Sequence, residues 1–145
     1  MKKVLFLCTG NSCRSQMAEG WTDFLLKHNF KAFSAGTKPG SLDPRAVKVM
    51  AEAGVDISDH RAKGVDEFKD VDFDLVVTVC DNARESCPTW FGKTKKLHQS
   101  FEDPPFLAKE AKTEEEALSH YRRVRDEIKD FILKLPEILK EGESK

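Results

Sequence analysis

The chain has 145 residues, of which 39% are hydrophobic and 34% are charged, and its formal net charge is -1. These values predict one folded domain spanning residues 1–145 with a well-solvated surface. They give no support for a nucleic-acid or membrane partner, because the charge is near neutral and no apolar run approaches the roughly 18 residues of a membrane span. Four cysteines are too few for a disulfide scaffold in a chain this long, so we expect a cytoplasmic protein whose cysteines serve catalysis, redox chemistry or metal binding.

The first half of the chain predicts strands that alternate with helices. The apolar run Lys3–Leu7 indicates a short buried strand and is too short for a signal peptide. Residues 16–28 carry apolar side chains at helical spacing, and residues 31–36 form a second predicted strand that ends at a glycine. The next helix is expected to have Asp43 as its N-cap and Gly54 just past its end.

The second half continues the same alternation. A short helical segment is expected at residues 65–68, followed by residues 73–80, FDLVVTVC, whose unbroken apolarity is typical of a strand covered on both faces. A weaker strand at residues 95–99 precedes a proline-rich loop at residues 100–106. Strands that alternate with helices in this way predict an α/β fold with a parallel sheet and helices on both faces.

The last predicted element is a long helix. It begins at a capping box formed by Thr113 and Glu116, and apolar residues then recur at helical spacing. Pro136 is expected to end or kink this helix, and residues 141–145 are expected to be a frayed tail. The basic run at residues 121–125, YRRVR, is interpreted as a solvated helix face.

Residues 8–15, with the sequence CTGNSCRS, join the first strand to the first helix and predict an oxyanion-binding site; we call them the oxyanion loop. The loop lies at the carboxyl end of a strand, where open parallel sheets bind ligands, and the following helix directs its positive dipole end there. Arg14 can donate hydrogen bonds to two oxygens of a tetrahedral anion. The positive charge of Arg14 and the positive dipole end of the helix favour the thiolate of Cys8 at the base of the loop. A plain strand-to-helix turn is the disfavoured alternative, and the sequence does not match the nucleotide P-loop. The residues expected to surround the anion are Thr9, Gly10, Asn11, Ser12, Cys13, Arg14 and Ser15.

Individual residues of the oxyanion loop have further expected roles. Gly10 and Asn11 are residue types that tolerate the positive φ angles of a tight loop. Ser15 could donate a hydrogen bond to the thiolate of Cys8. Cys13 is expected to be a packed residue that is not essential for the reaction.

The segment VLFLCTGNSCRSQMAEGW resembles the low-molecular-weight protein tyrosine phosphatase superfamily, and it most closely resembles the thioredoxin-coupled arsenate reductase branch of that superfamily. The segments SAGT, VVTVCDNARESCP, FEDP and YRRVRDEIKDFI follow in the order of the family. The resemblance therefore covers nearly the whole chain. It implies a four-stranded parallel sheet flanked by helices on both faces.

The resemblance also implies that Asp103, in the sequence EDPP, is the general acid that protonates the departing oxygen. Glu102 is the neighbouring alternative, and the dipeptide alone favours an Asp-Pro turn without a catalytic role. The proline-rich loop lacks the adjacent tyrosines that phosphatases of this superfamily use to stack a phosphotyrosine ring.

Two functions share these features, and the choice between them depends on Cys80 and Cys87. A phosphatase of this superfamily hydrolyses phosphate monoesters through a phospho-cysteine, whereas an arsenate reductase must take two electrons from thiols. The sequence TVCDNARESCP resembles the reductase branch at both cysteines, so arsenate reduction is the preferred hypothesis. Taken singly, the two residues could be an inert core cysteine and a surface thiol, and their spacing does not fit a zinc site. A non-catalytic anion-binding module is disfavoured because Cys8, Arg14 and Asp103 are all present.

The resemblance implies a relay of three cysteines. Cys8 attacks arsenate, for which phosphate or sulfate would be an analogue, and Cys80 then attacks Cys8 to release arsenite. If the first and third strands are neighbours, these two cysteines lie close to the Cα separation of about 4.4–6.8 Å that a disulfide needs. Cys87 finally attacks Cys80, and thioredoxin reduces the resulting disulfide. No cofactor is expected, and the protein is expected to be a monomer.

No metal is predicted either. Some arsenate reductases bind a potassium ion near this loop through residues that match Asn11, Glu19 and Ser34 here. The further acidic ligand is replaced by the Ala-Lys pair at residues 62–63, and the ammonium of that lysine could substitute for the cation.

Overall fold

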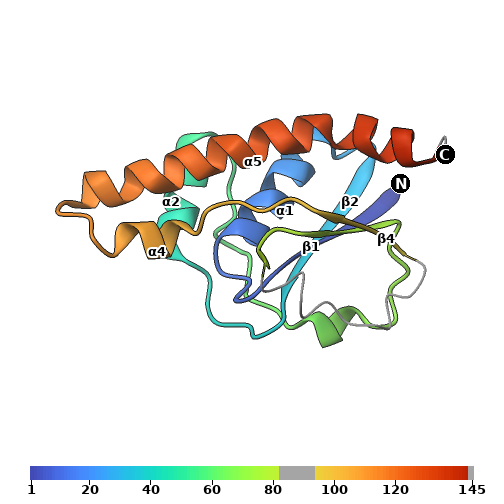
Figure 1. The fold of residues 1–145 in the computed structure, drawn as a ribbon, viewed down its shortest axis with the longest axis horizontal. Coiled ribbons are helices and arrows are strands. Elements are labelled where there is room, and N and C mark those ends of the chain that lie inside the picture. Colours follow the sequence, from blue (N-terminus) through green and yellow to red (C-terminus); the bar gives the residue numbers. More distant parts are fainter. Residues whose placement is uncertain (82–93, 144–145) are drawn as a thin grey trace.

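The sheet of this protein has four strands that all run parallel, in the order β2-β1-β3-β4 (Figure 1). The computed structural model describes residues 1–81 and 94–143. Its strands are β1 (Lys2–Cys8), β2 (Phe30–Gly36), β3 (Leu75–Thr78) and β4 (Lys95–His98). The predicted parallel α/β fold is confirmed, and β1 and β3 are neighbours, which is the condition for Cys8 and Cys80 to meet at one edge.

The two central strands are buried, as their apolar sequences predict. Residues 4–8 of β1 and the whole of β3 have buried side chains, because a parallel sheet of this kind is covered on both faces. β3 is shorter than the predicted strand at residues 73–80. The chain continues beside β1 for one more residue, since the backbone N–H of Val79 donates to the carbonyl of Leu7 over 2.9 Å.

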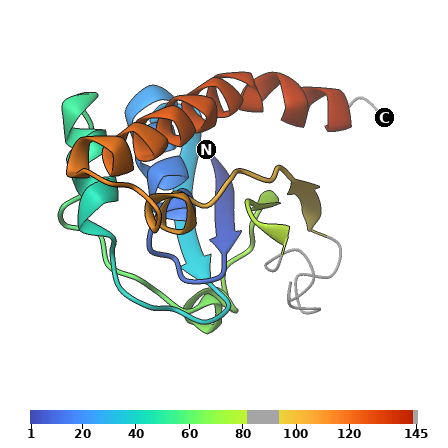
Figure 2. The same ribbon diagram turned by 60° about the vertical axis from the view of Figure 1, so that its left-hand side comes forward.

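Helical segments lie on both faces of the sheet. In the described part of the chain they are α1 (Arg14–Leu25), α2 (Pro44–Glu52), the 3₁₀ helix η1 (Val65–Phe68), α4 (Pro104–Ala108) and α5 (Glu114–Glu143). The long helix α5 crosses one face together with α1, whereas η1 lies on the other side of the strands (Figures 1 and 2). There Phe68 packs edge-on against Phe33 and Phe73, with ring centroids 5.4 and 6.2 Å away.

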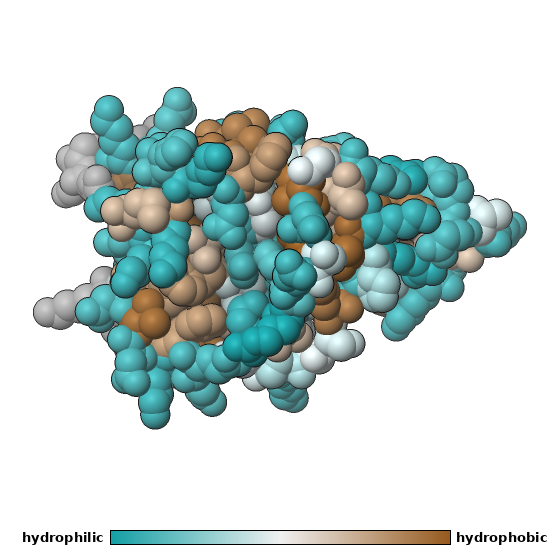
Figure 3. All heavy atoms as spheres, turned by 180° about the vertical axis from the view of Figure 1, so that it is seen from behind, coloured by the Kyte–Doolittle hydropathy of each residue, from teal (hydrophilic) through white to brown (hydrophobic). Residues whose placement is uncertain are grey.

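The core lies between α1, α5 and the sheet. Met17 and Trp21 of α1 are buried there, as the apolar stripe of this helix predicts. Hydrophilic side chains dominate the rear face of the molecule, with hydrophobic residues visible between them (Figure 3). Among the described residues, no helix is both long enough and apolar enough to cross a membrane.

The signals that begin and end helices mostly act as expected. The side chain of Asp43 accepts a hydrogen bond from the backbone N–H of Arg45 over 2.9 Å and so caps α2. Gly54, just past the end of α2, has a φ of +87°, which favours glycine. The loop predicted at residues 100–106 is partly helical, because α4 begins at Pro104, and proline is preorganised for the first position of a helix.

The helix α5 begins at the predicted cap but does not end where predicted. The backbone N–H of Glu116 donates to Thr113 Oγ1 over 3.1 Å. The helix then passes through Pro136 and runs on to Glu143, so of the two predicted alternatives the one in which proline ends the helix is wrong, and residues 141–143 are helical rather than a frayed tail. The φ of proline fits a helix and the lost N–H removes one hydrogen bond, a loss offset by the buried apolar residues on either side.

The basic run at residues 121–125 is not the solvated face that the sequence suggested. Tyr121 is buried, and its hydroxyl donates to Asp43 Oδ2 over 2.6 Å. Arg122 pairs with Glu52 of α2, and Arg125 donates to the carbonyl of Val49 over 2.9 Å. These contacts join α5 to α2. The segment that precedes α2, at residues 37–43, lies against the oxyanion loop.

Replacing Tyr121 by Phe tests the contact between α5 and the cap of α2. Tyr121→Phe should lower the free energy of unfolding by about 1–2 kcal/mol, because a part-buried hydrogen bond is lost and a carboxylate oxygen loses its partner. Urea denaturation followed by circular dichroism measures this. Ser119→Ala removes an exposed hydroxyl from the same helix and should change stability by less than about 0.5 kcal/mol. Equal effects of the two variants would contradict this account of the contact.

Candidate active site

The oxyanion loop is held from outside by the segment at residues 37–43. Backbone N–H groups of this segment donate, over 2.9–3.1 Å, to the carbonyl oxygens of Cys8, Thr9, Gly10 and Ser12. In a trans peptide the C=O and the following N–H point in opposite directions, so these bonds turn the next N–H groups toward the inside of the loop. An anion placed there would meet several backbone donors and the N-terminal end of α1.

Asn11 fixes the shape of this loop. Its φ is +51°, and it is the one non-glycine among the described residues in the left-handed region, whereas Gly10 does not adopt that conformation. The buried side chain donates through Nδ2 to Ser15 Oγ over 2.8 Å. Its Oδ1 accepts from the backbone N–H of Lys63 over 2.8 Å and from Gln16 Nε2 over 3.0 Å. Asn11 therefore joins the loop, the start of α1 and the segment before η1.

The sulfur of Cys8 lies at the base of the loop beside two donors. The backbone N–H of Asn11 donates to Sγ over 3.2 Å, and Ser15 Oγ lies 2.8 Å from Sγ. Because Ser15 Oγ already accepts the N–H of Asn11, its own proton is available to the sulfur. The predicted contact between Ser15 and Cys8 is present, and the sulfur therefore lies beside one hydroxyl and one backbone N–H.

Gly36 is a residue of the site that the sequence analysis missed. It ends β2 directly opposite Cys8 in the register of the sheet. A Cβ atom at this position would lie 2.5 Å from the carbonyl oxygen of Thr9 and 3.0 Å from the backbone N of Asn11. The oxyanion loop therefore rests on a position where only glycine fits, and the glycine at the end of the predicted strand was the available signal.

Arg14 and Asp103 are brought together above the loop. Arg14 Nη1 donates to the carbonyl of Phe101 over 2.9 Å, and its Nη2 lies 3.6 Å from Asp103 Oδ1. Asp103 is the residue just before α4 and is about half exposed. Glu102, the alternative acid, instead lies 3.2 Å from Arg123 of α5. The geometry thus favours Asp103 over Glu102 as the acid nearest the loop.

Cys80 lies at the same edge of the sheet as the oxyanion loop, as expected from neighbouring β1 and β3. Its buried Sγ is 3.4 Å from Thr9 Oγ1. Cys8, Cys13 and Cys80 form no disulfide with one another. Cys87, the third member of the predicted relay, lies outside the described residues.

Cys13 is a thiol that the fold keeps protonated. The residue is 3% exposed, and this burial is the main cause of a pKa well above the usual value for cysteine. The negative charge of Asp43 is the second cause of the raised pKa. A thiol with a raised pKa is a poor nucleophile at neutral pH. Its position matches the prediction of a packed residue.

Lys63 lies among the residues that match the potassium ligands of some arsenate reductases. Its Nζ is 3.4 Å from Ser34 Oγ, 3.7 Å from Glu19 Oε1 and 2.9 Å from the carbonyl of Arg61. Burial lowers the pKa of Lys63, and the carboxylate of Glu19 opposes that shift. The ammonium is thus where the sequence analysis expected it to stand in for the cation.

This chain belongs to the low molecular weight phosphotyrosine protein phosphatase family, whose model matches residues 3–145. Its curated relatives carry a more specific name. The arsenate reductase of Bacillus licheniformis is 45% identical over 136 residues, covering 94% of this chain and 96% of the relative. The arsenate reductase of Bacillus subtilis is 46% identical over 127 residues, covering 88% of this chain and 89% of the relative.

Solved structures agree with these relatives. An arsenate reductase in the phosphate binding state superposes with a TM-score of 0.81 at 31% identity, covering 96% of this chain and 99% of that one. The resemblance to arsenate reductases noted in the sequence is confirmed, and so is the fold of the low-molecular-weight phosphatases.

Two glycines test whether the oxyanion loop depends on its support by β2. Gly36→Ala should weaken phosphate binding at least tenfold and lower the melting temperature, because the new Cβ pushes the loop backbone outward. Gly40→Ala is the matched control, since a Cβ there has no atom within 4 Å. Isothermal titration calorimetry with phosphate and thermal denaturation give the two readouts. Unchanged phosphate affinity in Gly36→Ala would show that the loop does not need this support.

The raised pKa of Cys13 predicts a difference in reactivity between the two thiols of the oxyanion loop. A thiol whose pKa is raised in the folded state keeps its proton through the usual titration range, so native Cys13 should resist iodoacetamide from pH 6 to about pH 9. Cys8 should be alkylated within that range. Mass spectrometry of peptides from the treated native protein measures both residues, and guanidinium should remove the protection of Cys13. Alkylation of native Cys13 as fast as Cys8 would contradict the prediction.

Proposed function

We propose that this protein reduces arsenate to arsenite, with Cys8 as the nucleophile and with Cys80 and Cys87 as the thiols that supply two electrons. The observation that carries the proposal is the position of Cys80, whose sulfur lies 3.4 Å from Thr9 Oγ1 of the oxyanion loop. The anion site alone serves a phosphatase equally well, but a second thiol beside it gives Cys8 a partner for oxidation. Relatives named arsenate reductases support the same choice.

In the first step the thiolate of Cys8 attacks the arsenic atom of bound arsenate. The loop N–H groups and Arg14 hold the arsenate oxygens, and Asp103 supplies the proton with which one oxygen leaves as water. The product is a covalent bond between Cys8 Sγ and arsenic in its +5 state. Arg14 lies close enough to Asp103, at 3.6 Å, to orient the acid and the anion together.

In the second step the thiolate of Cys80 attacks Cys8 Sγ. The sulfur–arsenic bond breaks, and its electron pair stays on arsenic, which leaves as arsenite in the +3 state. A disulfide between Cys8 and Cys80 remains. Adjacent parallel strands, about 4.8 Å apart, let the two sulfurs approach with movement of the loops alone.

In the third step Cys87 attacks Cys80, which releases the thiolate of Cys8 and moves the disulfide to Cys80–Cys87. Two electrons from the dithiol of thioredoxin then reduce this disulfide and complete the cycle. The roles of Cys87 and thioredoxin rest on the resemblance of the sequence to the reductase branch. Because this chemistry needs a reducing compartment, we further propose that the protein is cytoplasmic. We also propose that it is a monomer whose residues 1–145 act as one domain.

The alternative is a phosphatase that hydrolyses phosphate monoesters through a phospho-cysteine at Cys8. A single pair of assays distinguishes the two functions. Arsenate-dependent oxidation of NADPH in the presence of thioredoxin and thioredoxin reductase should be fast, and hydrolysis of p-nitrophenyl phosphate should be slow. Fast release of phosphate without arsenate-dependent oxidation would establish the phosphatase instead.

The relay makes a specific prediction for Cys87. Cys87→Ser should form one equivalent of arsenite per protein and then stop, because the disulfide between Cys8 and Cys80 cannot move outward. A rapid-quench assay of arsenite measures the single turnover, and Cys13→Ser, which removes a thiol outside the relay, should keep sustained turnover. Sustained thioredoxin-driven turnover by Cys87→Ser would rule out the relay.

A further inference from the structure

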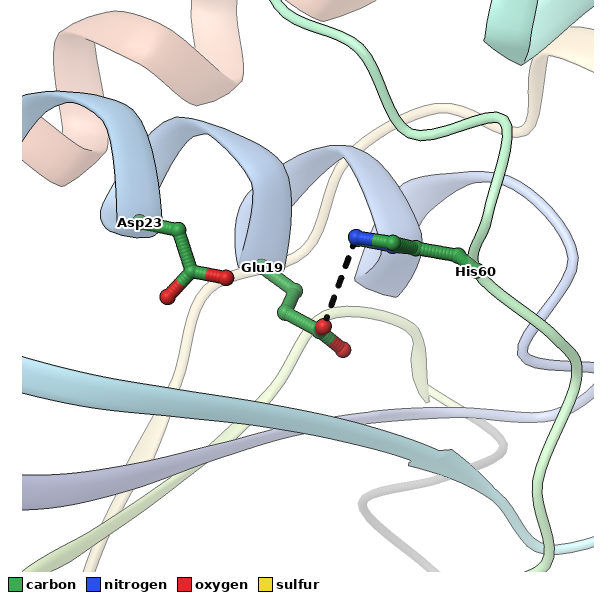
Figure 4. A group of neighbouring side chains, drawn as sticks. All are labelled: Glu19, Asp23 and His60. Carbon is green, nitrogen blue, oxygen red and sulfur yellow. Dashed lines mark ion pairs between the residues drawn. The ribbon is translucent and has the colours of Figure 1, made fainter.

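Three side chains of types that can bind a metal ion meet beside α1, outside the residues that the proposed reaction uses (Figure 4). Glu19 and Asp23 project from one side of α1, and His60 approaches from the segment after α2 (Figure 4). One ligand atom from each lies within 4.8 Å of the others. The two carboxylates are four residues apart on a helix, which places them on the same face.

The protonation of His60 is set by its neighbour Gln16. The amide nitrogen of Gln16 donates to the carbonyl of Arg61 over 2.8 Å and to the carbonyl of Asn11 over 3.0 Å, so the amide oxygen is the atom that faces the histidine. His60 Nδ1 lies 2.9 Å from that oxygen and must therefore carry a proton. When the ring is neutral, its lone pair is therefore on Nε2, which lies 3.6 Å from Glu19 Oε2. Metal-binding histidines are oriented in this way by a hydrogen bond at the other ring nitrogen.

The oxygens of Glu19 are divided between two environments. Oε1 accepts from Ser34 Oγ over 2.5 Å and lies 3.7 Å from the ammonium of Lys63. Oε2 points to the other side, toward His60. The cluster is thus distinct from the position filled by Lys63, and the single positive charge of Lys63 does not balance two carboxylates.

Asp23 completes the cluster with a second negative charge. The residue is exposed overall, and its carboxylate lies within 4.8 Å of the ligand atoms of Glu19 and His60. A surface hollow of about 210 Å³ is lined by Asp23 and His60, which leaves room for water beside them. The ammonium of Lys63, 3.7 Å from Glu19 Oε1, is one positive charge beside two carboxylates, and a divalent ion would add to that compensation.

We propose that Glu19, Asp23 and His60 bind one divalent first-row transition cation, such as Mn²⁺ or Zn²⁺, with water completing its coordination. Two ligands about 2.1 Å from one metal, at angles of about 90–110°, lie about 3.0–3.4 Å apart. The separation of 3.6 Å between His60 Nε2 and Glu19 Oε2 is close to this range, and the pairs that include Asp23 lie within 4.8 Å, so a bound ion would draw the side chain of Asp23 inward. Carboxylate and imidazole ligands together suit Mn²⁺, Fe²⁺, Co²⁺ and Zn²⁺. This site departs from the sequence prediction that the protein binds no metal.

The proposed ion would connect to the oxyanion loop through a short chain of hydrogen bonds. His60 donates to Gln16, Gln16 donates to Asn11, and Asn11 donates to Ser15, which contacts Cys8. A cation at His60 would keep Nδ1 as the donor and tie the segment after α2 to α1. We therefore expect the metal to stabilise the fold around the loop rather than to touch the substrate.

Binding of Mn²⁺ tests the site, because this ion prefers oxygen and nitrogen ligands and competes poorly for the thiols. Protein treated with EDTA and dialysed is titrated with Mn²⁺ at pH 7.5, and the loss of the free Mn²⁺ signal is followed by electron paramagnetic resonance. Wild-type protein should bind one equivalent. Asp23→Asn and His60→Gln should each lower the affinity at least tenfold, whereas Asp70→Asn, at an exposed site on the turn after η1, should leave it unchanged.

A second readout separates binding at this site from binding elsewhere. Saturating Mn²⁺ should raise the melting temperature of the wild-type protein and of Asp70→Asn, but not that of Asp23→Asn. Because Asp23 is exposed, its amide variant should fold even if His60→Gln does not. Less than one equivalent bound by the wild type, or equal affinity in wild type and Asp23→Asn, would overturn the proposal. Neither result depends on whether the protein reduces arsenate.

Discussion

The buried side chain of Asn11 is the contact on which the candidate site depends. Its backbone adopts a left-handed conformation that costs free energy in a non-glycine residue, and its amide group offsets that cost through hydrogen bonds to Ser15, Gln16 and the backbone of Lys63. These bonds fix the conformation of the loop and leave a proton of Ser15 for the sulfur of Cys8. If this amide were lost, the start of α1 and the segment before η1 would lose their common partner.

The parallel sheet adds the second constraint, because it brings strand ends from distant parts of the sequence to one edge. β1 supplies Cys8 and the start of the oxyanion loop, and β3 leads to Cys80. β2 supplies Gly36, the position against which the backbone of the loop packs. The anion site, its steric support and the second thiol therefore follow from one strand order. In the proposed function, the thiol of Cys80, two residues past the end of β3, is what suits this fold to reduction.

Local signals in the sequence were sufficient for much of this structure. The cap at Asp43, the buried central strands and the contact of Ser15 with Cys8 all depend on residue type and short spacing, and each was predicted. The support by Gly36 was missed, because it depends on how closely β2 approaches a loop from another part of the chain. The sequence left open whether Pro136 ends or kinks α5, and the helix continues because buried contacts on both sides of the proline outweigh one lost hydrogen bond. The link from Gln16 to His60 has no sequence motif, because it joins residues from different elements.

The central claim is that Cys8 and Cys80 exchange electrons with arsenic at one edge of the sheet. It is tested most directly by identifying the disulfide that one equivalent of arsenate leaves in protein whose Cys87 is replaced by Ser. Alkylation, digestion and mass spectrometry without reduction should find a Cys8–Cys80 cross-link in nearly every molecule, and none when phosphate replaces arsenate. Recovery of both cysteines as alkylated thiols, after arsenate has been shown to bind, would contradict the account.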